Sequence, residues 1–269
     1  MTSTTYVHGY TPREAQRLLD QAGTLAELFH HDTAYPPGSR VLEAGCGVGA
    51  QTVELARRSP GAEITAVDIS SESLAAAERR MRDAGLDGVR FRQADLLDLP
   101  FPDASFDHVI LCFVLEHLPD PDPALRRLVR AVRPGGTVTA IEGDHGSTFF
   151  HPDDPFARRT IDALVELQRR GGGHALIGRE LYPRFVAAGL SNVCVSPRFV
   201  YADASRPAIV EGFTRLTFAA MVEGVTDDAL RAGLMSREDW DRGIRALYRC
   251  AEPDGVFCYT FFKATAVKT

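Results

Sequence analysis

A doubly wound α/β fold with a mostly parallel sheet is predicted by three features of the sequence. Between residues 40 and 142, five short runs of branched apolar residues alternate with segments of helical spacing. The turn Gly45–Gly49 joins the first run to the next helical segment, and two later runs end in an acid, Asp68 and Asp95. Alternation of this kind places the strands parallel in one sheet, with helices on both faces.

The amino-terminal half is then assigned in order. Thr11 as N-cap, Pro12 at the first helical position and Glu14 at the third predict the start of a helix, which ends before the turn at Tyr35–Gly38. Its apolar residues share one face, so we expect it to pack on the body of the protein. The five expected strands are 40–44, 63–69, 89–95, 109–114 and 137–142, and helices begin near residues 50, 70 and 123.

The pattern changes after residue 142. We expect a loop over 143–151, helices over 156–170 and 177–188, and a helical insertion between two β-rich runs, 191–201 and 255–267. Two late strands that flank one insertion suggest an antiparallel pair at the edge of the sheet. The predicted units are an arm and helix (1–34), a core (35–145), an insertion helix, crossover helix and sixth strand (146–203), a helical lid (204–254) and a last strand (255–269).

Composition and charge exclude several classes of function. The net charge of −6 argues against a nucleic-acid partner, because phosphate binding requires a basic face. No apolar run approaches about 18 residues and no charged-then-apolar leader is present, so we expect a cytoplasmic protein with no membrane partner. His30 and His31 diverge on a helix, so we interpret them as a solvated helix end and expect no metal site. The five cysteines are scattered, without C-x-x-C spacing, as in reduced intracellular proteins.

A nucleoside-binding site is predicted where the first two strands end. A glycine turn between a strand and a helix lets a ligand approach the backbone, because no Cβ intervenes and the first helical N–H groups are free. Asp68 ends the neighbouring strand, where a carboxylate can bind both hydroxyls of a ribose. The turn reads G-x-G-x-G and not the dinucleotide pattern G-x-G-x-x-G, so this motif alone leaves two cofactor classes open.

Five motifs together resemble the class I S-adenosylmethionine-dependent methyltransferases, in the small-molecule branch that includes ubiquinone and menaquinone biosynthesis enzymes. In chain order they are VLEAGCGVG (41–49), AVDIS (66–70), QADLLDLPF (93–101), SFDHVILCFVLEHLPDP (105–121) and RPGGTVTAIE (133–142). The resemblance implies a Rossmann-like sheet of seven strands whose last strand is antiparallel. It also implies S-adenosyl-L-methionine as cofactor, S-adenosyl-L-homocysteine as product and a small-molecule methyl acceptor.

The resemblance implies cofactor contacts at the carboxyl ends of the strands. The glycines of the turn would approach the methionine part and the ribose, Asp68 would hold the ribose hydroxyls, and Asp95 would accept the adenine amine. Ile69 and Leu96 would pack on the adenine. The full implied set is Glu43, Gly45, Gly47, Gly49, Asp68, Ile69, Asp95, Leu96, Cys112 and Phe113.

Methyl transfer by in-line displacement needs a base only if the acceptor must lose a proton. His117 and Glu116 follow the fourth strand, and His145 and Glu142 lie at the end of the fifth, so all four are candidates. Some members of the family pair a tyrosine of the amino-terminal arm with a histidine after the fourth strand, and Tyr10 or Tyr6 with His117 matches that arrangement loosely. The alternative interpretation is that His117 and Glu116 brace the next helix.

The candidate acceptor pocket is aromatic. Its expected lining comes from the arm, from the insertion and from the helical lid, namely Tyr6, His8, Phe149, Phe150, Phe213, Phe218 and Met221. Such a lining favours a planar or ring-containing metabolite over a charged amine. Relatives with a similar arm and EGDHGS loop suggest natural-product methyltransferases that act on nitrogen heterocycles, indole-containing compounds among them.

The predicted function is therefore transfer of a methyl group to a small aromatic or heterocyclic metabolite, by a monomer or homodimer. One alternative is a nicotinamide-dependent oxidoreductase, which fits Gly45 and Asp68 but not the third glycine or Asp95. The other is a non-catalytic protein that binds S-adenosylmethionine.

Overall fold

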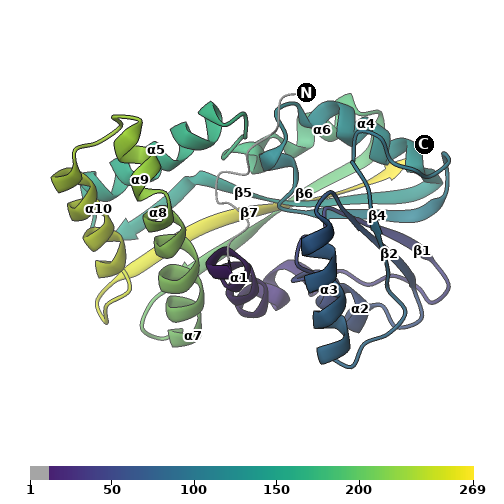
Figure 1. Cartoon of the computed structure of the whole chain (residues 1–269), viewed down its shortest axis with the longest axis horizontal. Helices are drawn as coiled ribbons and strands as arrows, with labels where there is room; N and C mark the ends of the chain where they lie inside the picture. The colour runs from purple at the N-terminus through teal and green to yellow at the C-terminus, as the bar shows by residue number, and fades with distance from the viewer. Residues whose placement is uncertain (1–11) are drawn as a thin grey trace.

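The computed structural model describes residues 12–269 as two layers of helices around one twisted sheet (Figure 1). The seven strands are β1 (Arg40–Ala44), β2 (Glu63–Asp68), β3 (Arg90–Gln93), β4 (Phe106–Cys112), β5 (Val132–His151), β6 (Leu190–Ala202) and β7 (Val256–Lys268). They lie in the order β3-β2-β1-β4-β5-β7-β6. The first five are parallel, and β7 is antiparallel to both of its neighbours. The predicted fold, including the reversed last strand, is confirmed.

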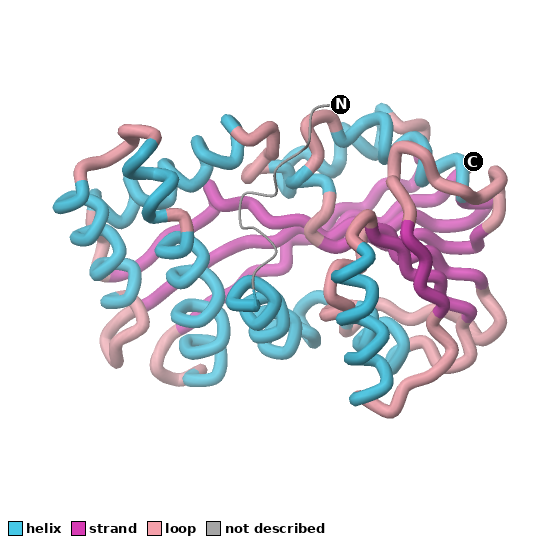
Figure 2. Tube along the Cα trace, in the orientation of Figure 1, coloured by secondary structure: helices cyan, strands magenta, loops and turns pink. Residues whose placement is uncertain are grey.

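Figure 2 shows the sheet between two rows of helices. The longer helices are α1 (Pro12–His30), α2 (Thr52–Arg58), α3 (Ser71–Asp83), α4 (Pro121–Ala131), α5 (Pro155–Arg170), α6 (Leu181–Ala187) and α10 (Arg237–Arg249). Shorter ones are α7 (Pro207–Ile209), α8 (Ala220–Gly224) and α9 (Thr226–Arg231), with 3-10 turns η1 (Leu115–His117) and η2 (Ile177–Glu180). Residues Val210–Ala219 form a π-helical segment, η3.

Side chains cap helices such as α3 and α5, whereas Thr11, the predicted cap of α1, lies outside the described residues. Ser70 accepts a hydrogen bond from the Ser73 amide at the start of α3, and Asp154 accepts bonds from the Phe156 and Ala157 amides at the start of α5. These bonds satisfy amides that have no partner within the helix.

One assignment was wrong: residues 143–151 are not a loop. β5 continues to His151 because its second half pairs with β7, with Phe149 opposite Cys258 and Phe150 opposite Phe257. The register shifts between Asp144 and Phe149. The lengthened β5, β6 and β7 extend beyond the other strands on the left of Figure 1, where α5 and α8–α10 surround them.

The end of α1 is also different from the prediction. His30 is fully buried, and its Nε2 lies 2.7 Å from Oε1 of Gln51. Just beyond it, Asp32 accepts a hydrogen bond of 2.6 Å from the buried Lys263 of β7 and forms an ion pair with Arg198 of β6. The end of α1 is therefore attached to the sheet and to the start of α2, and it is not a solvated terminus.

Candidate active site

A cavity of about 930 Å³ opens at the carboxyl ends of the parallel strands. One end is bounded by the glycine turn, Asp68 and Asp95, and the other by His145 and aromatic residues of η3 and β7. Single-ligand pockets have volumes of roughly 300–1,000 Å³. The volume of this cavity is near the upper end of that range.

Asp68 holds the glycine turn in shape from the end of β2. Its Oδ2 accepts a hydrogen bond of 2.8 Å from the Gly47 amide, and its Oδ1 accepts one of 2.9 Å from the Ser70 amide. Gly47 has φ +53°, and a Cβ built on it meets no atom within 4 Å. Each carboxylate oxygen retains a lone pair, so the diol of a ribose fits over this turn.

The cavity has two walls at the ends of the neighbouring strands β2 and β3. Asp95 follows β3, and its Oδ1 accepts a 2.8 Å hydrogen bond from the Leu97 amide. Ile69 and Leu96 line the cavity beside it, and Ile69 is 59% exposed. The exposed side chain of Ile69 is suited to cover one face of a flat ring, and the carboxylate of Asp95 is suited to accept a hydrogen bond from an amine on that ring.

Gly49 differs from the other glycines of the turn. It does not line the cavity, and a Cβ at this position would lie 2.8 Å from Cβ of Ala77 in α3. Its φ of +77° also favours glycine. The structure assigns Gly49 to close packing of the turn against α3, where the resemblance had implied a cofactor contact.

Glu43 supplies a buried acid beneath the glycine turn. It is 3% exposed, and its Oε2 has no hydrogen-bond partner among the described residues. Burial, together with the nearby charge of Asp68, raises the pKa of Glu43 to about 8. An ammonium group would supply the missing donor and stabilise the carboxylate form, so Glu43 fits the amine of an amino-acid ligand.

Cys112 and Phe113 form the middle of the cavity wall, where β4 ends. Phe113 has φ +60°, an unusual value for a side chain of this size. Its ring packs edge-on against Phe29 of α1 and Phe261 of β7, with centroids 5.4 and 5.5 Å away. Strained residues held by such packing cluster at functional sites.

The part of the cavity near His145 is apolar, and Phe213, Phe218 and Met221, which were predicted to contact an acceptor, line the cavity. The π-helical turn of η3 brings Phe213 and Phe218 to one face, because its hydrogen bonds span five residues. Thr217 lies between them and donates its hydroxyl to the Gly212 carbonyl, 2.6 Å away.

Phe149 and Phe150 do not line the cavity. Phe149 is 51% exposed and stacks on Phe199, and Phe150 is buried against Phe257 with parallel rings. Both lie on the part of β5 that pairs with β7, which carries them past the end of the site. Tyr6, His8 and Tyr10 lie outside the described residues.

Three of the four candidate bases border the cavity: His117, Glu116 and His145. Nε2 of His117 is 3.6 Å from Oε1 of Glu116. Glu142 does not line the cavity. Its Oε1 instead accepts hydrogen bonds of 3.0 and 2.8 Å from the amides of Val114 and Leu115, so it holds the start of η1.

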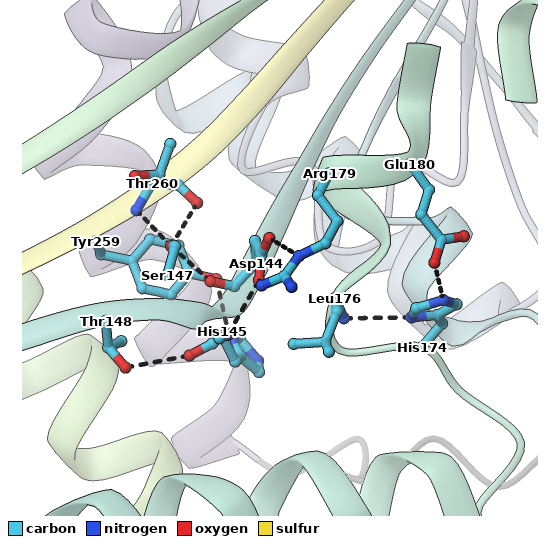
Figure 3. A network of polar contacts seen from close by, with 11 residues as sticks. Asp144, His145, Ser147, Thr148, His174, Leu176, Arg179, Glu180, Tyr259 and Thr260 are labelled. Atoms are coloured by element: carbon cyan, nitrogen blue, oxygen red, sulfur yellow. Dashed lines mark hydrogen bonds and ion pairs between the residues drawn. The ribbon is translucent and has the colours of Figure 1, made fainter. Parts of the chain in front are cut away.

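His145 lies deepest among the three. It is 6% exposed, its Nδ1 is 2.8 Å from the Tyr259 hydroxyl, and its Nε2 has no hydrogen-bond partner among the described residues. Figure 3 shows this pair beside Asp144, whose carboxylate forms a two-point ion pair with Arg179 at 2.6 and 2.7 Å. Burial lowers the pKa of His145 to about 4. The ring is therefore neutral at physiological pH.

Several residues of the cavity lining were not predicted. They are Arg17 and Gln21 of α1, Gln51 at the start of α2, Thr217 of η3, and Tyr259 and Phe261 of β7. The first two are spaced i, i+4 and the last two i, i+2, so each pair shares one face of its element. These spacings are visible in the sequence. Which face meets the cavity is set by packing between distant parts of the chain.

The fold and the cavity define a class of protein: an α/β domain whose cavity has two strand-end acids and, beside them, an apolar compartment, as is typical of domains that bind a nucleoside cofactor. Residues 42–140 match the family model described as a methyltransferase domain. The domain is of the class I S-adenosylmethionine-dependent methyltransferase family.

The relatives agree with this assignment. The chain is 40% identical over 103 residues to the demethylmenaquinone methyltransferase of Thermus thermophilus, covering 38% of this chain and 46% of that protein. It is 36% identical over 138 residues to methyltransferase GfsG of Streptomyces halstedii, covering 50% and 49%. The chain thus spans about half the length of these curated relatives. The YcgJ protein of Bacillus subtilis has the same fold, with TM-score 0.57, 20% identity and coverage of 91% and 98%.

Two features are absent from residues 12–269. No helix in this part of the chain is long and apolar enough to cross a membrane. No three His, Cys, Asp or Glu side chains in it are grouped so that they could hold a metal ion.

Proposed function

We propose that this chain transfers a methyl group from S-adenosylmethionine to a small, largely apolar acceptor that contains an aromatic or heterocyclic ring. The observation that carries the proposal is the continuity of the cavity from Asp68 and Asp95 to Phe213, Phe218 and His145. Bound along the strand ends, the cofactor supplies a methyl group activated by its sulfonium charge. Asp68 and Asp95 are suited to hold the adenosine, and Glu43 to hold the ammonium.

The chain's own residues contribute mainly by placement. A lone pair of the acceptor forms a bond to the methyl carbon while the carbon–sulfur bond breaks, and the sulfonium charge is lost. The aromatic wall of η3 and β7 excludes water and aligns the acceptor. Placement and avoided solvent reorganisation contribute roughly 7–11 kcal/mol in favourable cases. An acceptor that must lose a proton can pass it to His117, which lies at the cavity wall beside Glu116.

Two measurements test the function. Calorimetry should show binding of S-adenosylmethionine and S-adenosylhomocysteine to the purified chain, and a labelled-methyl screen should show transfer to indolic, quinol or other ring-containing acceptors. Absence of binding contradicts the proposal. Labelling of phenols alone would rule out the heterocyclic acceptor. Binding without transfer to any acceptor, including those in lysate fractions, would favour the non-catalytic alternative.

The role of His117 is tested by a separate variant. His117→Ala should lower kcat about 10²–10⁴-fold if His117 acts as the base, because a positioned base contributes about that much. The Kd for S-adenosylhomocysteine should change little, since His117 is not among the predicted cofactor contacts. A similar loss in kcat and in cofactor affinity would instead assign His117 to bracing of η1.

A further inference from the structure

His145 and Tyr259 form a buried pair at the acceptor end of the cavity. The two residues come from neighbouring strands, β5 and β7, and they are 6% and 1% exposed. Their side chains meet at 2.8 Å between Nδ1 and the hydroxyl (Figure 3). Gly143 makes the space for this contact, because a Cβ there would lie 2.5 Å from the Tyr259 hydroxyl.

The proton positions in this pair follow from its surroundings. Burial raises the pKa of Tyr259 well above its ordinary value, so the phenol keeps its hydrogen, and the backbone amide of Asp144 partly offsets that rise by donating to the phenol oxygen. Because the phenol oxygen already accepts from that amide, we assign the phenol hydrogen to the 2.8 Å contact with Nδ1 of His145. A neutral imidazole that accepts at Nδ1 carries its one hydrogen on Nε2.

Nε2 of His145 is thus a donor, and it is the ring atom that has no partner among the described residues. His145 lines the cavity, and Phe218 packs edge-on against its ring at 6.0 Å. A buried N–H without an acceptor is costly, so a ligand that supplies a lone pair at this point is favoured over one of the same shape that does not.

Resting on the proposed function, we propose that His145, held by Tyr259 as the Nε2–H tautomer, donates a hydrogen bond to the methyl acceptor. The acceptor is then a flat, apolar molecule with a carbonyl oxygen or an unprotonated ring nitrogen that faces His145. In this arrangement His145 cannot take a proton at Nε2, so it orients the acceptor and is not the base. Tyr259 is a positioning residue, because it acts through His145.

The tautomer is measured on the full chain labelled with ¹⁵N-histidine, and the His145 signals are assigned by difference from His145→Gln. The expected result is a protonated Nε2 and an unprotonated Nδ1 at neutral pH. In Tyr259→Phe the donor to Nδ1 is lost, and a mixture of tautomers is expected while the fold is retained. A protonated Nδ1 in the wild-type protein overturns the proposal.

The acceptor chemistry is tested with two probes of equal shape, quinoline and naphthalene, in the presence of S-adenosylhomocysteine. Quinoline, which has a ring-nitrogen lone pair, should shift the Nε2–H proton, and naphthalene should not. His145→Leu should weaken quinoline binding about tenfold, and His145→Gln, which keeps an N–H donor, should restore part of it. An unmoved proton, or equal binding by His145→Leu, overturns the proposal. Calorimetry with S-adenosylhomocysteine on the same samples reports separately on the proposed function.

Discussion

Replacing Asp68 by alanine is expected to raise the Kd for S-adenosylhomocysteine at least about 100-fold. Two hydrogen bonds from a ribose diol to a carboxylate contribute roughly 1.5–3 kcal/mol each, or about 3–6 kcal/mol together, and each 1.4 kcal/mol is about tenfold in affinity. The substitution also removes the oxygens that accept from the Gly47 and Ser70 amides, so the glycine turn loses its support. Isothermal titration calorimetry measures the change.

Two further variants separate binding from folding. Asp68→Asn keeps one acceptor oxygen and nearly the same shape, so its Kd should lie between those of wild type and Asp68→Ala. Asp98→Ala makes the same change of charge at an exposed position near the end of β3 that does not line the cavity, and its Kd should stay within about twofold of wild type. An Asp68→Ala protein that binds as tightly as wild type would show that this acid does not hold the cofactor.

The half of the site that could be predicted is the half that depends on local pattern. Asp68 and Asp95 end apolar runs, and in a parallel sheet the carboxyl ends of strands share one edge, so their proximity follows from alternation alone. Phe213 and Phe218 line the cavity, which agrees with the expectation that a helical insertion between two edge strands covers the site. The resemblance to a family then supplied the identity of the cofactor.

The other half depends on pairing between distant segments. Phe149 and Phe150 follow a glycine-rich stretch that is typical of a loop, yet β7 extends β5 through them and removes them from the site. Tyr259 was visible as part of an aromatic strand, but only the register of β7 on β5 brings it to His145. His30 looked solvated beside His31, but it is buried against Gln51. Gln51 is 21 residues away in the chain, so no local pattern of residues predicts this contact.

The burial of His30 leads to the second large prediction, which concerns stability and pH. Burial, together with the charges of Lys263 and Arg58, lowers the pKa of His30 to about 4, against a raising effect of the Gln51 hydrogen bond. The unfolded chain has an ordinary histidine pKa of about 6.5. Below pH 6.5 the unfolded state therefore binds a proton that the folded state does not bind. The stability that neutral His30 contributes is complete above pH 6.5 and is lost as the pH falls towards 4.

His30→Gln should remove that dependence, because glutamine does not titrate. The difference in unfolding free energy between wild type and His30→Gln should fall by about 2–3 kcal/mol from pH 7.5 to pH 4.5, measured by urea denaturation at each pH. Burial raises the pKa of Glu43 and of Glu142, so these two groups make the folded state more stable as the pH falls, which is opposite to the effect of His30. Both groups are present in wild type and in His30→Gln, so their contribution cancels in the difference.

A matched control shows whether a loss of buried packing alone could produce the same dependence of the unfolding free energy on pH. Thr160 is fully buried in α5, and its hydroxyl donates to the Ala157 carbonyl, 2.8 Å away, with no titrating group in the bond. Thr160→Val should therefore change stability by the same amount at every pH. If wild type and His30→Gln instead gave parallel curves, His30 would have to protonate as easily in the folded protein as in the unfolded chain. The hydrogen bond that joins α1 to Gln51 at the cavity wall would then have to tolerate a charged imidazole inside the protein.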